Sequence, residues 1–397
     1  MFYNKTAMSA LTEKLSLLNQ AADWDLGEEA ICPKHAPHRR EDIVLYRAQA
    51  GGRRRITLFK TLLTSACERD CAYCPFRAGR DFRRASYRPE ELATVFMQLH
   101  RQGVAQGLFL SSGIARGGQR TQDRLLATAE ILRRREGYRG YLHLKLMPGA
   151  DKEQVLRTMQ LADRISVNLE APGARFLQRL APHKRYWGEL LQLLRWVAEI
   201  QQEHHPAEFG LPRWPSVTTQ FVVGAAGESD RDLLAVAAEW LPKLTLRRVY
   251  FSPFRPIPDT PLENHPPEDP RRAHHLHQAF FLLRDYSFAF EELPLDERGN
   301  LPRHSDPKQA WADAHLREHP VELNTAPKER LLRVPGLGPR RVGLLLRVRR
   351  EVRLRSVEQL RALGFPVQRM SPYILLDGRR PPQQLRLSLP LEEALPT

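Results

Sequence analysis

Three of the four cysteines lie in one short stretch of the chain, TSACERDCAYCPFRAGR. They are Cys67, Cys71 and Cys74, spaced C-x3-C-x2-C, and the aromatic Tyr73 stands between the second and the third. Three thiolates this close cannot all pair as disulfides, but all three can turn inward on one loop and bind a metal ion or an iron–sulfur cluster. A structural site is normally closed by protein ligands, whereas three ligands leave one position open for chemistry.

A structural zinc site or a group of buried thiols is the alternative for these cysteines. Zinc ligands usually come as two separated pairs, and the sequence has no second pair. The fourth cysteine, Cys32, lies in ICPKHAPH with His35 and His38 nearby as further donors. Because no pairing partner is close in the sequence, we expect Cys32 to be a lone thiol on the solvent side.

The pattern C-x3-C-x-aromatic-C resembles the cluster motif of the radical S-adenosylmethionine (SAM) enzymes. In that family three cysteines bind three irons of a [4Fe–4S] cluster, and SAM chelates the fourth iron. An electron from the cluster cleaves SAM, and the resulting 5'-deoxyadenosyl radical abstracts a hydrogen atom from the substrate. The resemblance implies that Cys67, Cys71 and Cys74 are the cluster ligands and that Tyr73 lies near the SAM adenine.

The elements that must position this loop alternate between strand and helix from residue 53 onward. Strands are expected at 53–64, 107–113, 141–149, 163–170, 216–224 and 246–254, and helices at 88–103, 121–137, 151–162, 186–205 and 228–241. Six such alternations favour a parallel sheet covered by helices, which right-handed crossovers curl into a barrel or part of one. Ligands collect at the carboxyl ends of such strands, where the cysteine loop begins. The resemblance implies the same fold, an α/β partial (β/α)6 barrel.

Small or polar residues follow the second and third strands. Ser111, Ser112 and Gly113 stand where many radical SAM enzymes have the sequence GGE, and the resemblance places them at the methionyl amino group of SAM. A small-residue turn that only closes the strand is the alternative. Lys145 is expected to meet the SAM carboxylate or a substrate phosphate, or else to extend from the barrel rim into solvent.

The later strands end in further candidates. Asn168 and Glu170 alternate onto one side of an otherwise apolar strand, where the resemblance places the SAM ribose hydroxyls. The turn GAAGES, with Gly224 and Glu228, resembles a turn that contacts the adenine in many family members. Glu228 is alternatively a support for the first turn of the next helix. Residues 250–254 are expected to close over the adenine.

The remaining segments set the predicted domain boundaries. Residues 5–22 have the pattern of an amphipathic helix, with Leu11, Leu15 and Leu18 on one face, and residues 23–52 look irregular. The predicted divisions are an N-terminal lead-in at 1–52, the barrel at 53–290, a polar connector at 291–326 and a small all-α domain at 327–397.

A group of histidines lies near the end of the barrel, in RRAHHLHQAFFLLRDY. His274, His275 and His277 do not all fall on one helix face, so we expect solvated or substrate-facing side chains rather than a metal site.

A second motif lies in the C-terminal domain, in LLRVPGLGPRRVGLLLRVRR. Two apolar helical runs joined by VPGLG resemble the helix-hairpin-helix module of DNA repair and recombination proteins. Glycines let the backbone approach a ligand closely, and amides at the start of a helix point at an anion. The resemblance assigns Gly336, Gly338, Arg340 and Arg341 to a DNA backbone phosphate, and it favours a small residue at Gly343, where the two helices would cross.

The distribution of charge agrees with that assignment. The chain has 61 Lys and Arg against 46 Asp and Glu, a net charge of +15. Residues 327–356 hold ten Lys and Arg against two Glu, a net +8 in that segment alone. A general arginine bias would spread more evenly, so we expect contacts with a nucleic acid backbone. A hairpin used for protein contacts, or one that binds RNA, is the alternative.

Together these features predict a radical SAM enzyme with a nucleic-acid-binding tail. The stretches RITLFKTLLTSACERDCAYC, GLFLSSGI, HLKLMPGA and SVNLEAP resemble radical SAM proteins assigned to DNA modification or repair. The resemblance implies DNA as the substrate, an electron donor, and a partner similar to uracil-DNA glycosylase. The alternatives are a radical SAM enzyme acting on transfer RNA or other RNA, one acting on a small molecule or peptide, and a non-catalytic DNA-binding protein with a structural cluster or zinc.

The sequence also argues against a membrane protein. No apolar run approaches the roughly 20 residues that span a bilayer, and the N-terminal MFYNKTAMSALTEKL lacks the apolar core of a signal peptide. With few cysteines, most of them clustered for a metal, we expect a protein of the reducing cytoplasm.

Overall fold

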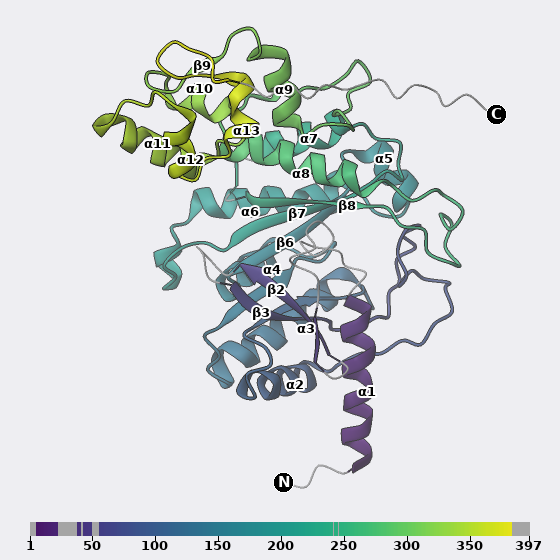
Figure 1. The fold of residues 1–397 in the computed structure, drawn as a ribbon. Helices are drawn as coiled ribbons and strands as arrows, with labels where there is room; N and C mark the ends of the chain where they lie inside the picture. Colours follow the sequence, from purple (N-terminus) through teal and green to yellow (C-terminus); the bar gives the residue numbers. More distant parts are fainter. Residues whose placement is uncertain are drawn as a thin grey trace, which may run out of the picture. The chain divides into compact units, whose positions relative to one another are not determined.

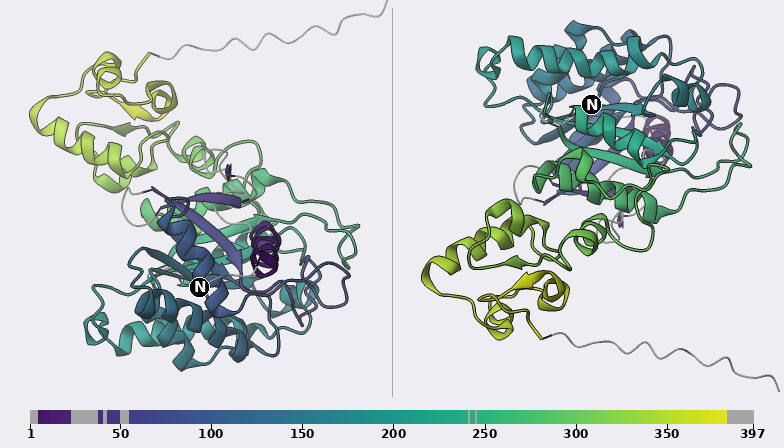
Figure 2. Two further views of the ribbon diagram at one scale, coloured as in Figure 1. Left: turned by 90° about the horizontal axis from the view of Figure 1, so that it is seen from below. Right: turned by 90° about the horizontal axis from the view of Figure 1, so that it is seen from above.

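The computed structural model describes residues 5–22, 38–40, 43–49, 55–240, 242–244 and 246–382 (Figure 1 and Figure 2). Cys32 and His35 lie outside these ranges. The chain divides into two compact units. The first comprises Met1–Phe280 and Glu297–Asn300, and the second comprises Phe281–Asp296 and Leu301–Thr397.

The first unit is built on one curled sheet, with its strands ordered from β1 to β8 as in the sequence. They are β1 (His38–Arg40), β2 (Ile43–Gln49), β3 (Arg55–Leu62), β4 (Gly107–Ser111), β5 (Tyr141–Lys145), β6 (Arg164–Glu170), β7 (Ser216–Val223) and β8 (Leu246–Pro253). Strands β3 to β8 pair in parallel, which confirms the six predicted strands and the α/β partial barrel. Strand β2 pairs antiparallel with β3, and β1 pairs antiparallel with β2, so the prediction of irregular structure is wrong for residues 38–40 and 43–49.

Side chains alternate in character along the parallel strands. In β5, Leu142 and Leu144 are fully buried on the side of the helices, and the intervening His143 faces the inside of the curled sheet. In β6, Ile165 and Val167 pack outward in the same way, whereas Ser166 faces inward. Because successive side chains point to opposite faces, the outer face forms the apolar core and the inner face is largely polar.

Helices cover the outer face of the sheet (Figure 1). They are α2 (Pro89–Arg101), α3 (Gly118–Glu130), α4 (Lys152–Leu161), α5 (Ala174–Leu180), α6 (Gln192–Glu203) and α7 (Asp230–Trp240), with π-helical turns at Ile131–Arg135 and Tyr186–Leu191. The five predicted helices are present. The second begins earlier than predicted, because Gly117 is its N-cap and Thr121 is buried inside it, donating its hydroxyl to the Gly117 carbonyl at 2.9 Å.

The N-terminal helix α1 (Lys5–Ala21) confirms the predicted amphipathic helix. Leu18 is fully buried in the core, and Leu11 and Leu15 pack against the same core. The buried Asn19 amide donates to the carbonyls of Val44 (2.9 Å) and Lys60 (2.8 Å). These bonds join α1 to β2 and β3 and so help to hold β2 beside β3.

The histidines near the end of the barrel lie on α8 (Pro270–Asp285). His274 is exposed, but His275 and His277 are buried, so the prediction of solvated or substrate-facing side chains is wrong for these two. The His277 ring bridges the Ala273 carbonyl (2.6 Å) and the backbone N–H of Phe251 in β8 (3.2 Å). Both ring nitrogens are therefore used in holding α8 on the sheet.

The second unit is mostly helical, with α9 (Pro307–His315), α10 (Lys328–Arg333), α11 (Pro339–Glu351), α12 (Val357–Ala362) and α13 (Val367–Met370). It also contains a two-stranded parallel sheet of β9 (Val321–Glu322) and β10 (Ile374–Leu375), so the prediction of an all-α domain is wrong in this detail. The buried Arg333 forms an ion pair with Glu292 at 2.7 Å and lies 3.8 Å from the Phe288 ring centroid. These contacts attach the 281–296 segment to α10.

Among the described residues, no helix combines the length and the apolar character needed to cross a membrane.

Candidate active site

A cavity of about 350 Å³ lies at the carboxyl ends of the parallel strands of the first unit. Its walls are formed by the ends of β3 to β8 and by the loops that follow β3 and β8. Most of the residues predicted to bind the cluster or SAM line this one cavity: Cys67, Cys71, Tyr73, Cys74, Ser111, Ser112, Gly113, Lys145, Asn168 and Glu170.

The cysteine loop is held by backbone contacts with the turn that follows β4. The Gly113 N–H donates to the Thr64 carbonyl (2.7 Å), and the Ile114 N–H donates to Cys67 Sγ (3.4 Å). A Cβ atom at Gly113 would lie 2.4 Å from the Ala66 carbonyl oxygen. Glycine is therefore required here because the cysteine loop packs directly on the turn, whatever the turn contributes to SAM.

Cys71 is buried, and Cys67 and Cys74 are half-buried. Burial raises the pKa of Cys71 and of Cys74 above the ordinary value for a thiol, and the nearby Lys184 ammonium opposes this effect. Within the described ranges, no three His, Cys, Asp or Glu side chains are arranged so that they could bind a single metal ion. The donor set itself, three thiols on one cavity wall, is the one that iron–sulfur clusters use.

An unpaired carboxylate atom of Glu170 shows how the cavity fits a nucleoside cofactor. It is buried at the end of β6, beside an irregularity in the pairing with β7, and its φ of 65° lies in the left-handed region. Its Oε1 atom accepts from Lys184 Nζ at 3.3 Å, and its Oε2 atom has no hydrogen-bond partner among the described residues. Buried polar atoms are normally paired, so a ligand hydroxyl such as that of the SAM ribose fits this position.

Tyr73 lies on the same side of the cavity as Glu170. Burial raises the pKa of Tyr73 well above the ordinary value, and the Glu170 carboxylate raises it further. The phenol therefore keeps its proton at any physiological pH and presents a neutral aromatic ring to the cavity.

Lys184 is a cavity residue that the sequence analysis missed. Burial by itself would lower the pKa of Lys184, but the negative charges of a Cys71 thiolate and of the Glu170 carboxylate raise it above the ordinary value. The loop that carries Lys184 is joined to the cysteine loop by Arg69, which donates to the His183 carbonyl at 3.2 Å and forms an ion pair with Glu189. Lys184 follows an irregular segment, APHK, that matches no motif, so only the fold reveals its position.

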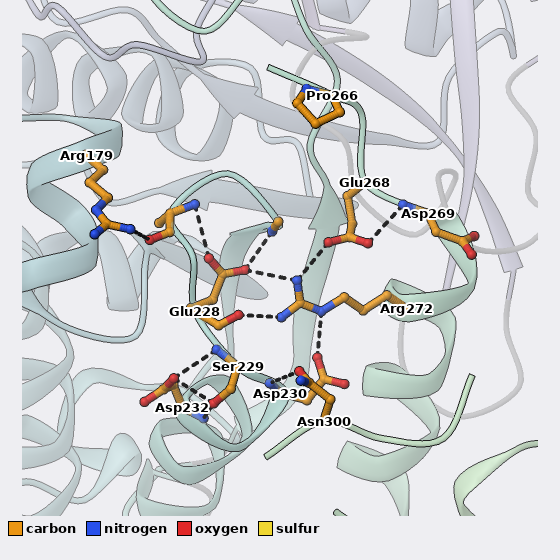
Figure 3. A network of polar contacts seen from close by, with 12 residues as sticks. Arg179, Glu228, Ser229, Asp230, Asp232, Pro266, Glu268, Asp269, Arg272 and Asn300 are labelled. Carbon is orange, nitrogen blue, oxygen red and sulfur yellow. Dashed lines mark hydrogen bonds and ion pairs between the residues drawn. The ribbon is translucent and has the colours of Figure 1, made fainter. Parts of the chain in front are cut away.

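Two predicted SAM contacts, Gly224 and Glu228, are not brought to this cavity. The Glu228 carboxylate instead accepts from the backbone N–H groups of Gly224 (2.6 Å) and Ala226 (3.2 Å), so it closes its own turn (Figure 3). Arg272 of α8 reinforces the turn, donating to the Glu228 carbonyl at 2.6 Å.

Arg272 also binds two further carboxylates, Asp230 at 2.6 Å and Glu268 at 2.7 Å, and its side chain is 6% exposed (Figure 3). The turn after β7 is thus fixed by a buried guanidinium surrounded by three acids. The network joins two segments that are distant in the sequence, 224–230 and 268–272, so no local pattern predicts it.

The residues predicted to cover the adenine divide between two places. Ser252, Pro253 and Phe254 line the cavity, whereas Tyr250 lies deeper, inside the curled sheet.

Comparison with known proteins finds a family model that matches part of the chain. Residues 61–239 match the family model described as the radical SAM superfamily. No curated protein matches the sequence.

Several solved structures resemble part of the chain. The FeFe-hydrogenase maturase HydG from Carboxydothermus hydrogenoformans is 14% identical, with a TM-score of 0.45 over 57% of this chain and 51% of its own. Methylornithine synthase (PylB) is 15% identical, with a TM-score of 0.44 over 57% of this chain and 62% of its own. The radical SAM methyltransferase TsrM from Kitasatospora setae is 16% identical, with a TM-score of 0.39 over 52% of this chain and 38% of its own.

The match therefore spans about half the length of HydG and less than two thirds of the other two. The family model begins at the end of β3 and includes the cysteine loop and the ends of β4 to β7, but not β8. With three thiols on the wall of that cavity, residues 61–239 match the radical SAM superfamily, a family of enzymes whose cofactors are a [4Fe–4S] cluster and SAM.

Proposed function

We propose that this protein is a radical SAM enzyme that acts on DNA. When bound, the cluster and SAM supply a one-electron cleavage and a radical that abstracts hydrogen. In this proposal Cys67, Cys71 and Cys74 hold the cluster, and Glu170 accepts from the ribose hydroxyls of SAM. The opening of the cavity at the strand ends then receives the substrate.

The observation that carries the choice of DNA is the hairpin of α10 and α11. Its loop buries Val334 and Leu337, and Gly336 has a φ of 87°, a conformation that favours glycine. Gly338 is the N-cap of α11, which has 13 residues, so the first amides of this helix are available to an anion. These features support a helix-hairpin-helix module.

The charges around the loop support the same proposal. Arg340 and Arg341 are exposed in the first turn of α11, and Arg341 donates to the Gly336 carbonyl at 3.1 Å. Gly343 departs from expectation, because it is exposed and a Cβ atom there would meet nothing within 4 Å, so the helices do not cross tightly at this residue. The phosphate contacts in the proposal therefore rest on Gly336, Gly338, Arg340 and Arg341.

A base stacked in a duplex is out of reach of a cavity at the end of a barrel. The proposed substrate is therefore a flipped nucleotide or a single strand. The proposed partners are an electron donor and a protein similar to uracil-DNA glycosylase, which would suit the modification or repair of a base.

The experiment measures binding and SAM cleavage separately. Duplex DNA binding is titrated against salt for the wild type, for Arg340→Gln/Arg341→Gln, and for the control Arg134→Gln/Arg135→Gln, which removes two exposed arginines from the first unit. We expect the first double variant to bind at least about tenfold more weakly and to lower the salt slope by up to about 2. The control should bind like the wild type.

SAM cleavage is then assayed anaerobically by release of 5'-deoxyadenosine, with and without DNA, against Cys71→Ala. Release that depends on Cys71 and increases with DNA supports the full proposal. Preference for folded RNA over duplex DNA would favour an RNA substrate, and turnover unaffected by either would favour a small molecule or peptide. DNA binding without any SAM cleavage would leave a non-catalytic DNA-binding protein.

A further inference from the structure

A second, smaller cavity of about 60 Å³ lies inside the curled sheet of the first unit. Asn168 of β6 and Gln220 of β7 line both this cavity and the larger one. The smaller cavity therefore adjoins the proposed SAM site and lies deeper along the strands. We call it the lumen cavity.

Three cationic side chains contribute to the lining of the lumen cavity. Arg47, Lys60 and Arg164 contribute to its walls, and none of the described residues that line it is Asp or Glu. Lys60 is 2% exposed, and its Nζ lies 5.0 Å from the ring centroid of Tyr46 and 5.4 Å from that of Phe109. Positive groups with low-dielectric walls raise the local concentration of anions and of other electron-rich groups.

Buried hydroxyl groups add donors to the same cavity. Ser166 Oγ, Thr219 Oγ1 and Tyr46 OH line it, and none of the three has a hydrogen-bond partner among the described residues. Ser166 is 7% exposed and Thr219 and Tyr46 are each 3% exposed. Buried polar groups without partners are uncommon in folded proteins, and a ligand that accepts hydrogen bonds would satisfy them.

The shape of the cavity limits what can enter. Aromatic side chains form part of its wall, and the rings of Phe109 and His143 are stacked with centroids 4.3 Å apart. A cavity needs about 10–15 Å³ to hold one water molecule. The lumen cavity, at about 60 Å³, therefore admits a group of a few atoms rather than a whole nucleotide.

We propose that the lumen cavity is a substrate subsite that binds a small group rich in oxygen acceptors. Two sources have this chemistry: the carbonyl edge of a nucleobase, and a phosphate. Lys60 supplies the charge, and the hydroxyls of Ser166, Thr219 and Tyr46 supply further donors. The rest of the substrate then lies in the larger cavity beside SAM. Only this placement of the rest of the substrate rests on the proposed function.

The test measures binding calorimetrically with the reconstituted full-length protein, without SAM cleavage and without polymeric DNA. The probes are inorganic phosphate, thymidine, whose base carries two carbonyl oxygens, and 2'-deoxyadenosine, whose base carries none. The variants are Lys60→Met and Ser166→Ala. The matched control is Lys152→Met, which removes a lysine whose side chain is 41% exposed in the same unit.

We expect phosphate or thymidine to bind, with affinity lower by about tenfold or more in Lys60→Met and by about fivefold in Ser166→Ala, because a lost bond to a charged donor weakens binding more than a lost neutral one. The control should bind like the wild type, and 2'-deoxyadenosine should bind more weakly than thymidine. Binding of phosphate alone identifies a phosphate as the source, and binding of thymidine alone identifies a carbonyl edge.

The proposal is overturned if neither phosphate nor thymidine binds, or if both variants bind them as the wild type does. Equal binding of 2'-deoxyadenosine with the same sensitivity to Lys60 would also overturn it, since that base lacks the carbonyl acceptors. Ser166→Ala removes one oxygen atom, so it keeps the test decisive if Lys60→Met does not fold. Loss of duplex binding by the hairpin, or failure to cleave SAM, would contradict the proposed function and leave this result unchanged.

Discussion

At the scale of single residues, the cysteine loop depends on a residue that binds no iron. Gly113 lies where a Cβ atom would meet the Ala66 carbonyl oxygen at 2.4 Å and Cys67 Cβ at 3.2 Å. Neither backbone nor Cβ atoms can move aside without moving the loop. The position of Cys67, the first of the proposed cluster ligands, is therefore set in part by the absence of a side chain at Gly113.

Gly113→Ala should displace the cysteine loop at a cost of about 1–3 kcal/mol in the folded state, because the added methyl overlaps backbone. We expect the variant to bind clearly less iron and sulfide per chain than the wild type after anaerobic reconstitution. Gly173→Ala is the control, since a Cβ atom there meets only Phe176, at 3.9 Å. Full cluster content in Gly113→Ala would show that this contact does not position the loop.

At the scale of elements, the strands were predictable because their side-chain pattern is local. The sequence YLHLK alternates apolar and polar residues, and it forms β5 with Leu142 and Leu144 outward and His143 inward. The same alternation also marks the polar inner face of the sheet, which lines the lumen cavity.

Other parts of the site could not be predicted, because they depend on contacts distant in sequence. Lys184 reaches the cavity only because its loop packs on the cysteine loop, where the Ala72 N–H donates to the Leu180 carbonyl at 2.7 Å. Glu228 was placed near the adenine by resemblance, yet its carboxylate closes its own turn and binds Arg272. Nothing in the local sequence distinguishes Arg272 from Arg271 beside it.

The adjacent arginines allow a sharp test of the turn after β7. Arg272→Met leaves the buried Glu228 and Asp230 without their cation, so we expect it to lower the unfolding free energy of the barrel by about 3–5 kcal/mol. Arg271→Met, at a side chain 76% exposed, should change it by less than about 0.5 kcal/mol. Urea unfolding measures both, and equal stability of the two variants would mean that the network does not hold the turn.

At the scale of the whole molecule, the two units contain buried bases that should make their stabilities respond differently to pH. In the first unit, burial lowers the pKa of His277 from 6.5 to about 3. In the second, burial and, to a lesser extent, the charge of Arg369 lower the pKa of Lys308 from 10.5 to about 7. Lys308 donates to the Leu337 carbonyl in the hairpin loop, and its Nζ lies 4.6 Å from the Tyr286 ring centroid.

In each case the unfolded chain holds a proton that the folded unit does not, so stability rises with pH through the window between the two pKa values. The first unit should lose stability as pH falls from 6.5 toward 3, and the second should gain it as pH rises from 7 toward 10.5. Each slope is at most about 1.4 kcal/mol per pH unit, the value for one proton.

Urea unfolding monitored by peptide-resolved hydrogen exchange gives the unfolding free energy of each unit separately at each pH. His277→Gln should flatten the acid response of the first unit, and Lys308→Met should flatten the alkaline response of the second. The exposed His274→Gln and Lys328→Met, from the same units, should leave both responses unchanged. If Lys308→Met retained the alkaline gain, the protonation responsible would lie elsewhere, and the hairpin loop would not depend on a neutral lysine beneath it.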